Sequence, residues 1–269
     1  MTAFTTHFTF EFRTGIRNRS LLFLTYLFPL IFYLMMGFIM PPLNPMFLPG
    51  FVPAMVTFAI LSAALLGIPD PLVTARETGI FRSYKINGVP AASILCIPAM
   101  STTLHLVLVS IVILATAPFL FSAPMPTNWP VFALTFLLFA FACLGIAVLI
   151  GVISPSSRNT VLLSQLIFIP SMLLGGLMIP YAMLPSSAQR LALLLPTTYA
   201  TNLFRGPAMG QPADFSPLLS VGILAAAGVL AFALALFLFS WNRRNAGRRG
   251  HPALALLALA PFVIGLIVV

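Results

Sequence analysis

The sequence predicts an all-α fold, a polytopic helical bundle in a membrane, and three observations lead to this class. Hydrophobic residues make up 60% of the 269 residues and charged residues only 6%, with a mean hydropathy of +1.09. Soluble globular domains carry about 25% charged residues, so a water-soluble fold is excluded. The uncharged gaps are long enough for complete helical spans. Their apolar runs are continuous, whereas the strands of a membrane β-barrel alternate.

Six core transmembrane helices are predicted, near residues 20–40, 51–69, 92–117, 130–153, 159–179 and 217–241. A span needs about 20 residues, at a rise of about 1.5 Å each, to cross about 30 Å of hydrocarbon. The two longest gaps must each fold back once, and each contains a proline-rich turn, at 41–45 and 118–130. Residues 252–269 form an additional hydrophobic helix, which we expect to be a seventh span ending outside.

The basic residues predict the orientation. All of the 13 lysines and arginines except Arg190 and Arg205 fall on one face if the spans alternate. The positive-inside rule makes that face, with the N-terminus, cytoplasmic. The excess of basic residues therefore indicates membrane topology and gives no reason to expect nucleic acid. We expect a multi-pass protein of the cell membrane, a bacterial inner or plasma membrane.

Three segments are not simple spans. Residues 1–19 are expected to be an amphipathic helix in contact with lipid at the cytoplasmic interface, the alternative being a frayed basic leader. Residues 71–88 are expected to be a cytoplasmic helix parallel to the membrane, with Asp70 as its N-cap and charged groups, including Arg76, offered to a partner. The alternative is a solvated basic loop. Residues 180–216 are too interrupted for a lipid-exposed span and too apolar for a free loop, so we expect an outer re-entrant hairpin. An ordinary outer loop is the alternative.

The sequence lacks the residues that most catalytic mechanisms require. Lys85 is the sole lysine and stands outside any Gly-Lys-Ser/Thr phosphate loop. The four acidic residues form no metal or proton-coupling cluster. His105, with Ser101 and Ser110 nearby, keeps an intramembrane hydrolase open as a hypothesis, but an interhelical hydrogen bond from a neutral His105 is the better interpretation. We therefore expect no catalytic, cofactor-binding or metal-binding residue. Aromatic side chains in the spans are candidates for lining a cavity for apolar cargo: Phe28, Phe32, Phe58 and Phe168.

Two motifs carry a resemblance to a known family. The first is Arg76-Glu77-Thr78-Gly79-Ile80-Phe81, followed by Pro90. The second comprises Gly175-Gly176, Pro180, Leu184-Pro185, Pro196-Thr-Thr-Tyr199 and Arg205. With the topology, they make residues 1–245 resemble the permease of a type-2 ATP-binding cassette exporter. The segment 252–269 exceeds that six-span plan.

This resemblance implies a function. The chain would be the permease subunit of an ATP-driven exporter, paired with itself or a paralogous permease and energised by two copies of a separate ATPase subunit that holds ATP and Mg. Coupling to the ATPase is assigned to Arg76, Glu77, Thr78, Gly79, Ile80, Phe81 and Arg82. The re-entrant hairpin is assigned Gly176, Pro180, Pro185, Pro196, Tyr199 and Arg205. Ile80 and Arg82 depart from the family pattern. Because the spans carry few charges, we expect a hydrophobic or amphipathic cargo, a drug or a lipid. The alternative function is a non-transporting membrane scaffold that anchors a partner complex.

Overall fold

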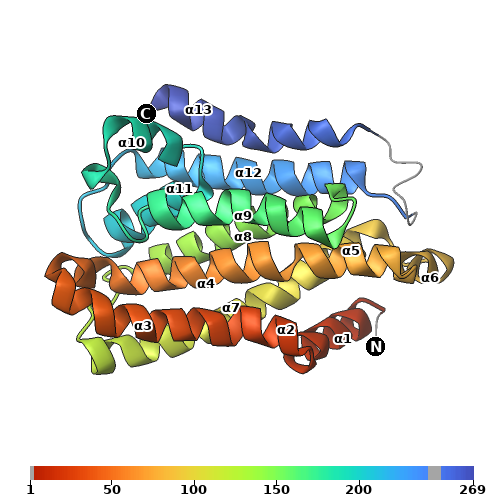
Figure 1. The fold of residues 1–269 in the computed structure, drawn as a ribbon, viewed down its shortest axis with the longest axis horizontal. Coiled ribbons are helices and arrows are strands. Elements are labelled where there is room, and N and C mark those ends of the chain that lie inside the picture. Colours follow the sequence, from red (N-terminus) through yellow and green to blue (C-terminus); the bar gives the residue numbers. More distant parts are fainter. Residues whose placement is uncertain (1–2, 242–249) are drawn as a thin grey trace.

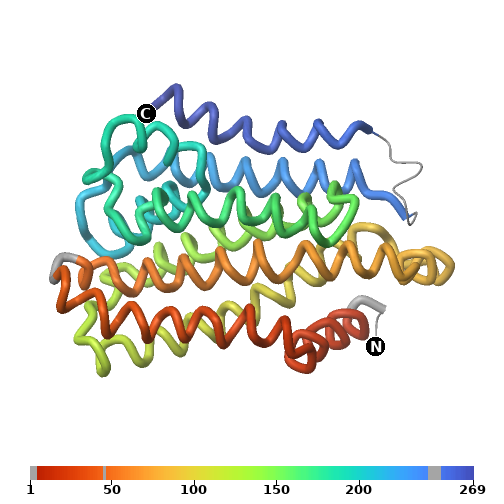
Figure 2. Tube along the Cα trace, in the orientation of Figure 1, coloured from red at the N-terminus to blue at the C-terminus, as the bar shows by residue number. Residues whose placement is uncertain are grey.

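The computed structural model describes residues 3–241 and 250–269, and every regular element in these ranges is helical. The long helices lie side by side in an up-and-down bundle whose connections gather at its two ends (Figures 1 and 2). The all-α prediction is confirmed. In chain order the elements are α1 (Ala3–Arg17), α2 (Arg19–Leu22), η1 (Phe23–Leu27), α3 (Phe28–Leu43), η2 (Pro45–Gly50), α4 (Phe51–Gly67), α5 (Pro69–Glu77), α6 (Ile80–Ile86), α7 (Ala91–Phe121), α8 (Trp129–Ile153), α9 (Ser157–Leu174), η3 (Tyr181–Met183), α10 (Ser186–Ala192), α11 (Pro196–Leu203), η4 (Phe204–Ala208), α12 (Pro217–Leu238), η5 (Pro252–Leu259) and α13 (Ala260–Val268).

Five helices in the described ranges are long and apolar enough to cross a membrane: Arg19–Leu43, Phe47–Glu77, Ala91–Phe121, Trp129–Ile153 and Pro217–Leu238. They correspond to five of the six predicted spans. The predicted span 159–179 corresponds to α9, which packs against α4 and α8 but begins with the polar run Ser157-Arg158-Asn159-Thr160. These polar residues lower its hydropathy, so the six-span plan is not confirmed.

The two ends of the bundle have different contents. One end, which we call the α6 end, holds α1, α6 and the start of α7; the other, which we call the hairpin end, holds α10, α11 and the C-terminus (Figure 1). The basic residues on α1, α2, α5, α6 and the start of α9 lie toward the α6 end, whereas Arg190 and Arg205 belong to α10 and η4 at the hairpin end. Arg243, Arg244, Arg248 and Arg249 lie outside the described residues.

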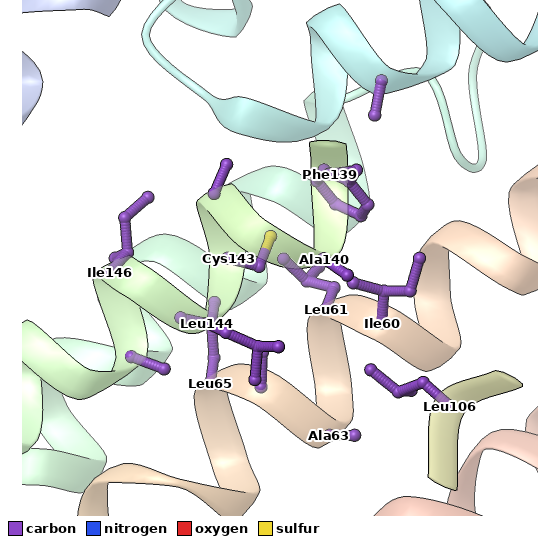
Figure 3. Close-up of a cluster of buried hydrophobic side chains, with 14 of the residues drawn as sticks. Ile60, Leu61, Ala63, Leu65, Leu106, Phe139, Ala140, Cys143, Leu144 and Ile146 are labelled. Carbon is purple, nitrogen blue, oxygen red and sulfur yellow. The ribbon is translucent and has the colours of Figure 1, made fainter. Parts of the chain in front are cut away.

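The core forms where α4 packs on α8. The most apolar part of Phe47–Glu77 is 94% buried, because α7, α8, α9 and α11 surround α4. Figure 3 shows Leu61 and Leu65 of α4 beside Ala140 and Cys143 of α8. Gly145 of α8 lets α12 approach closely, since a Cβ there would lie 3.1 Å from the Gly228 carbonyl oxygen. α4 is thus the central buried helix of the bundle, and any movement of it must also move the helices packed around it.

The C-terminal segment packs along α12 and runs antiparallel to it (Figure 1). Its first 8 residues form a 3₁₀ helix and its last 9 an α-helix. A 3₁₀ helix rises about 2.0 Å per residue, so together these segments reach about 30 Å. The predicted seventh span therefore has the length that a crossing requires, and its crossing stays a prediction.

Candidate functional site

The structure corrects the prediction of one helix over 71–88, because this segment forms two helices, α5 and α6. α5 follows α4 almost without interruption, and the break comes at Gly79, which adopts a left-handed φ of 84°. No atom lies within 4 Å of a Cβ built there, so the bend is set by backbone conformation and not by crowding. Asp70 is not the predicted N-cap, because it lies inside α5 and makes no capping hydrogen bond in the described structure.

Arg76 is not offered to a partner, which corrects a second expectation. Its side chain is only 3% exposed and reaches the C-terminal end of α8. Nη1 donates to the Val152 carbonyl oxygen at 3.1 Å, and Nη2 donates to the Ser154 carbonyl oxygen. Carbonyls at a helix C-terminus lack intrahelical donors and favour a cation. Arg76 therefore fastens α5 to the end of α8.

The other residues of the first motif divide between packing and exposure. Phe81 is buried, with its ring 5.3 Å from that of Phe239, while Ile80 is 44% exposed. The Thr78 hydroxyl donates to the Thr74 carbonyl oxygen within the helix. Arg82 is exposed and Glu77 half-buried. Within residues 3–241 and 250–269, Glu77 forms no ion pair, so local pairing with Arg76 or Arg82 is not seen.

The second motif begins with a close approach of two backbones. A Cβ on Gly175 would lie 1.9 Å from the Thr197 hydroxyl oxygen, and Gly176 has a left-handed φ of 83°. The Thr201 hydroxyl donates to the Gly175 carbonyl oxygen at 2.9 Å. The pair of glycines thus lets the end of α9 lie directly against α11.

Every residue of α11 is buried, and its polar groups have partners inside the protein. Pro196 begins the helix, and the Tyr199 hydroxyl donates to the Leu193 carbonyl oxygen at 2.7 Å. Asn202, which we did not single out from the sequence, accepts from the Asp214 backbone N–H at 2.8 Å and donates to the Phe215 carbonyl oxygen at 3.0 Å. α11 is therefore a fully buried helix, packed between α8, α9 and α12, whose polar side chains are hydrogen-bonded within the protein.

Arg205, which follows α11 in η4, is linked through Gln211 to η2, the segment between α3 and α4. Its Nε donates to Gln211 Oε1 at 3.3 Å, and Gln211 Nε2 donates to the Pro49 carbonyl oxygen at 3.0 Å. Arg205 also lowers the pKa of Asp214, although burial raises that pKa more. A cleft of about 250 Å³ here is lined by Gly176, Pro180 and Arg205, among others, while Pro185 is exposed before α10.

The four phenylalanines proposed to line a cavity form one aromatic cluster. Phe58 is at its centre, with ring-centroid distances of 3.8 Å to Phe32, 5.5 Å to Phe28 and 6.0 Å to Phe168. Phe58 and Phe168 are buried within the subunit. The cluster joins α3, α4 and α9, and its role toward cargo stays a prediction.

His105 makes the interhelical contact that we expected. Its Nδ1 lies 2.7 Å from the Tyr26 hydroxyl oxygen of η1, and its ring stacks on Phe12 of α1 at 4.4 Å. Among the described residues, neither Ser101 nor Ser110 forms a hydrogen bond with it, so the geometry gives no Ser–His pair for a hydrolase.

Comparison with known families places these two motifs in context. The profile of the ABC-2 type transporter family matches residues 2–209, which include α1, the α5–α6 bend and α11, while α12 and the C-terminal segment fall outside the match. No curated protein sequence matches the chain. Because the match covers most of the chain, this protein belongs to the ABC-2 type transporter family and is a membrane domain of that kind.

Proposed function

We propose that this chain is the permease subunit of an ATP-driven exporter, that two copies of a separate ATPase subunit energise it, and that it moves a hydrophobic or amphipathic compound, a drug or a lipid, outward. The observation that supports this most directly is the bent α5–α6 unit at the end of the buried helix α4. The permease would work as a pair with itself or with a paralogue, and ATP and Mg would be held by the ATPase.

The proposed mechanism depends on two groups of side chains at the α5–α6 bend, one exposed and one packed against the rest of the bundle. Glu77, Ile80 and Arg82 present side-chain surface on which an ATPase subunit could dock. Arg76 and Phe81 tie the same segment to α8 and to Phe239. A displacement of α6 would therefore be transmitted to α4 and α8 together, because packed helices move as units.

The proposed orientation puts the α6 end in the cytoplasm and the hairpin end outside. The concentration of basic residues at the α6 end supports this assignment. The buried, internally hydrogen-bonded α11 suits a re-entrant hairpin, since non-helical backbone at membrane depth is tolerated where protein covers it. Cysteines placed at Arg190 and Arg205 should then react with an impermeant reagent added outside, and labelling from the cytoplasm alone would reverse the topology.

The decisive test is reconstitution with the cognate ATPase. Glu77→Arg and Gly79→Leu should insert and pair normally but lose permease-stimulated ATP turnover and export. Lys85→Ala, an exposed change on the same segment, serves as the matched control and should leave turnover and export close to the unmodified level. Normal turnover with normal export in both coupling variants would refute this assignment. An ATPase that binds without any transport would favour the scaffold alternative.

A further inference from the structure

A cleft of about 290 Å³ lies at the α6 end, between α1 and the helices α4, α5, α6 and α7. Its size is at the lower end of small-molecule sites, which span about 300–1,000 Å³. Most of its wall is apolar, with Phe10, Leu21, Leu72 and Ile94 among the lining residues. It lies within one subunit and is separate from the aromatic cluster around Phe58. Ile80 and Phe81 of the coupling motif form part of its wall, whereas no residue assigned to the hairpin does.

The charges around this cleft oppose those of the surface nearby. Glu11 lines the cleft, and no lysine or arginine is among the described residues that do. A second cleft shares Asn18, Leu21 and Ala75 with it and adds the carboxylate of Asp70. Arg13 and Arg17 line an adjoining groove along α1, which shares Phe10, Thr14 and Asn18 with the cleft. The described residues that line the cleft itself therefore include a carboxylate and no lysine or arginine, although Arg13 and Arg17 line the adjoining groove.

Glu11 is incompletely compensated in this position. Its side chain is 24% exposed, and its one ion-pair partner in the described structure is His7, at 3.6 Å between Oε1 and Nε2. Burial raises the pKa of Glu11, and His7 offsets only part of that effect. Burial and, to a smaller extent, the charge of the Glu11 carboxylate raise the pKa of Tyr84, whose ring lies 5.4 Å from that of His7. A cation bound beside a partly buried carboxylate stabilises its charge, because their attraction is stronger where water is excluded.

His105 supplies a second polar group on the cleft wall. Its side chain is 3% exposed, and Nδ1 is occupied by the Tyr26 hydroxyl. Nε2 lies against the α1 backbone near Phe12 and Gly15 and has no hydrogen bond of good geometry in the part of the chain described. The hydroxyls of Ser101 and Thr102 line the same wall. The cleft thus combines apolar walls with a few polar groups, as ligand sites do.

We propose that this cleft binds a cationic amphiphile, a molecule with one ammonium group and a short apolar body. The ammonium group pairs with Glu11 and the apolar body lies along the walls between α1, α5 and α7. Occupation by a lipid acyl chain would use the same walls but would not need Glu11. Within the cleft itself an anionic group would face the Glu11 carboxylate, because Arg13 and Arg17 line the adjoining groove instead. The proposal goes beyond export, because binding requires the permease alone.

The test is photolabelling of the full-length permease in lipid nanodiscs without the ATPase. Three probes share one photoactivatable octyl chain and end in a primary ammonium, a hydroxyl or a carboxylate, and labelled residues are mapped by mass spectrometry. The ammonium probe should label α1, α5 and α7 around the cleft, and unlabelled octylammonium should compete. Glu11→Gln should lower its labelling at least tenfold while labelling by the hydroxyl probe stays unchanged. Asp214→Asn, the same change at the hairpin end, is the matched control and should have no effect on labelling.

A second variant tests the cleft independently of the charge. Ala75→Phe, which fills the cleft wall, should abolish labelling there by the ammonium and hydroxyl probes alike. Equal labelling by all three probes, or ammonium labelling unchanged by Glu11→Gln, would overturn the proposal in favour of a lipid-filled cleft. Preferential labelling by the carboxylate probe would also overturn it. Loss of labelling by the hydroxyl probe in Glu11→Gln would show that Glu11 supports the cleft structure instead of binding a ligand.

Discussion

The polar side chains of α11, at the hairpin end, and those of the cleft beside α1, at the α6 end, differ in how completely they are hydrogen-bonded. At the hairpin end, the polar side chains of α11 find partners within the protein, as Tyr199, Thr201 and Asn202 do. At the α6 end, Glu11 and His105 line a cleft with incomplete hydrogen bonding. An unsatisfied polar group in hydrocarbon costs several kcal/mol, and the internal hydrogen bonds of α11 avoid that cost. At the α6 end, these incompletely bonded groups lie beside the surfaces that we propose for the ATPase and for a ligand.

Unlike Glu11 and His105, Arg76 at the α6 end donates hydrogen bonds to backbone carbonyl oxygens at the end of α8. Its removal should have the largest effect on the free energy of unfolding. Arg76→Ala leaves the α8 terminal carbonyls without their cation and should lower the free energy of unfolding by about 3 kcal/mol, since hydrogen bonds to charged groups contribute about 1.5–3 kcal/mol each. Thermal unfolding in detergent measures this. Arg82→Ala, an exposed change six residues away, should fall within about 0.5 kcal/mol. Equal effects of the two variants would contradict the role assigned to Arg76.

The difference between Arg76 and Arg82 also shows what the sequence could predict. Composition and gap lengths predicted an all-helical membrane bundle, because the hydrocarbon core imposes length and hydropathy on any span. They could not reveal that one arginine of the motif turns inward, because its partners are backbone carbonyls 76 and 78 residues away. Backbone acceptors have no sequence signature.

Two other segments, α9 and the α5–α6 bend, also differ from what the sequence predicted. Prediction of a span over 159–179 depended on the uncharged gap after Arg158, but α9 begins at Ser157 and its polar first turn lowers its hydropathy. The bend at Gly79 was predictable as a possibility, since glycine permits a left-handed φ, but the sequence does not show which glycine adopts that conformation. Glu11 had one signal in the sequence: it is the only acid before Asp70.

Two glycine variants compare the ends directly. Gly175→Ala should cost about 2 kcal/mol, because its Cβ would overlap Thr197 and the Ser171 carbonyl oxygen, and overpacking costs about 1–3 kcal/mol. Gly79→Ala meets no atom and should cost about 1 kcal/mol, from the left-handed conformation alone. Gly79→Asn should recover most of that loss, since asparagine tolerates this conformation, whereas Gly175→Asn should not. Recovery at both positions, measured by thermal unfolding, would contradict steric crowding at Gly175.

Two tyrosine variants remove the same hydroxyl from each end. Tyr199→Phe leaves the Leu193 carbonyl oxygen buried without this donor and should cost about 1–2 kcal/mol. Tyr26→Phe frees Nδ1 of His105 beside the cleft, where water can replace the hydroxyl, and should cost about 0.5 kcal/mol. Thermal unfolding of both variants in the same detergent makes the comparison. A larger loss for Tyr26→Phe would reverse the assignment of the two ends as closed and adaptable.

The smallest effect should come from Glu11 and should depend on pH. Because burial raises the pKa of Glu11 in the folded protein, the folded state holds this proton more tightly than the unfolded state does. Its contribution to stability is therefore present below the unfolded pKa of about 4.3 and is lost as pH rises through the folded pKa. Glu11→Gln should consequently stabilise the protein at pH 7.5 by less than about 1 kcal/mol, and this gain should vanish near pH 4.

The same variant distinguishes desolvation from pairing with His7. If the His7 contact dominated, Glu11→Gln would destabilise the protein near neutral pH, and His7→Gln would do the same. Glu77→Gln, which lies outside the cleft, gives the size of a general glutamate-to-glutamine effect. Saturating octylammonium should raise the melting temperature of the unmodified protein at pH 7.5 and leave Glu11→Gln nearly unaffected, because a bound cation compensates the carboxylate only where it exists. Equal stabilisation of both proteins by octylammonium would show that the buried charge and the ligand act independently.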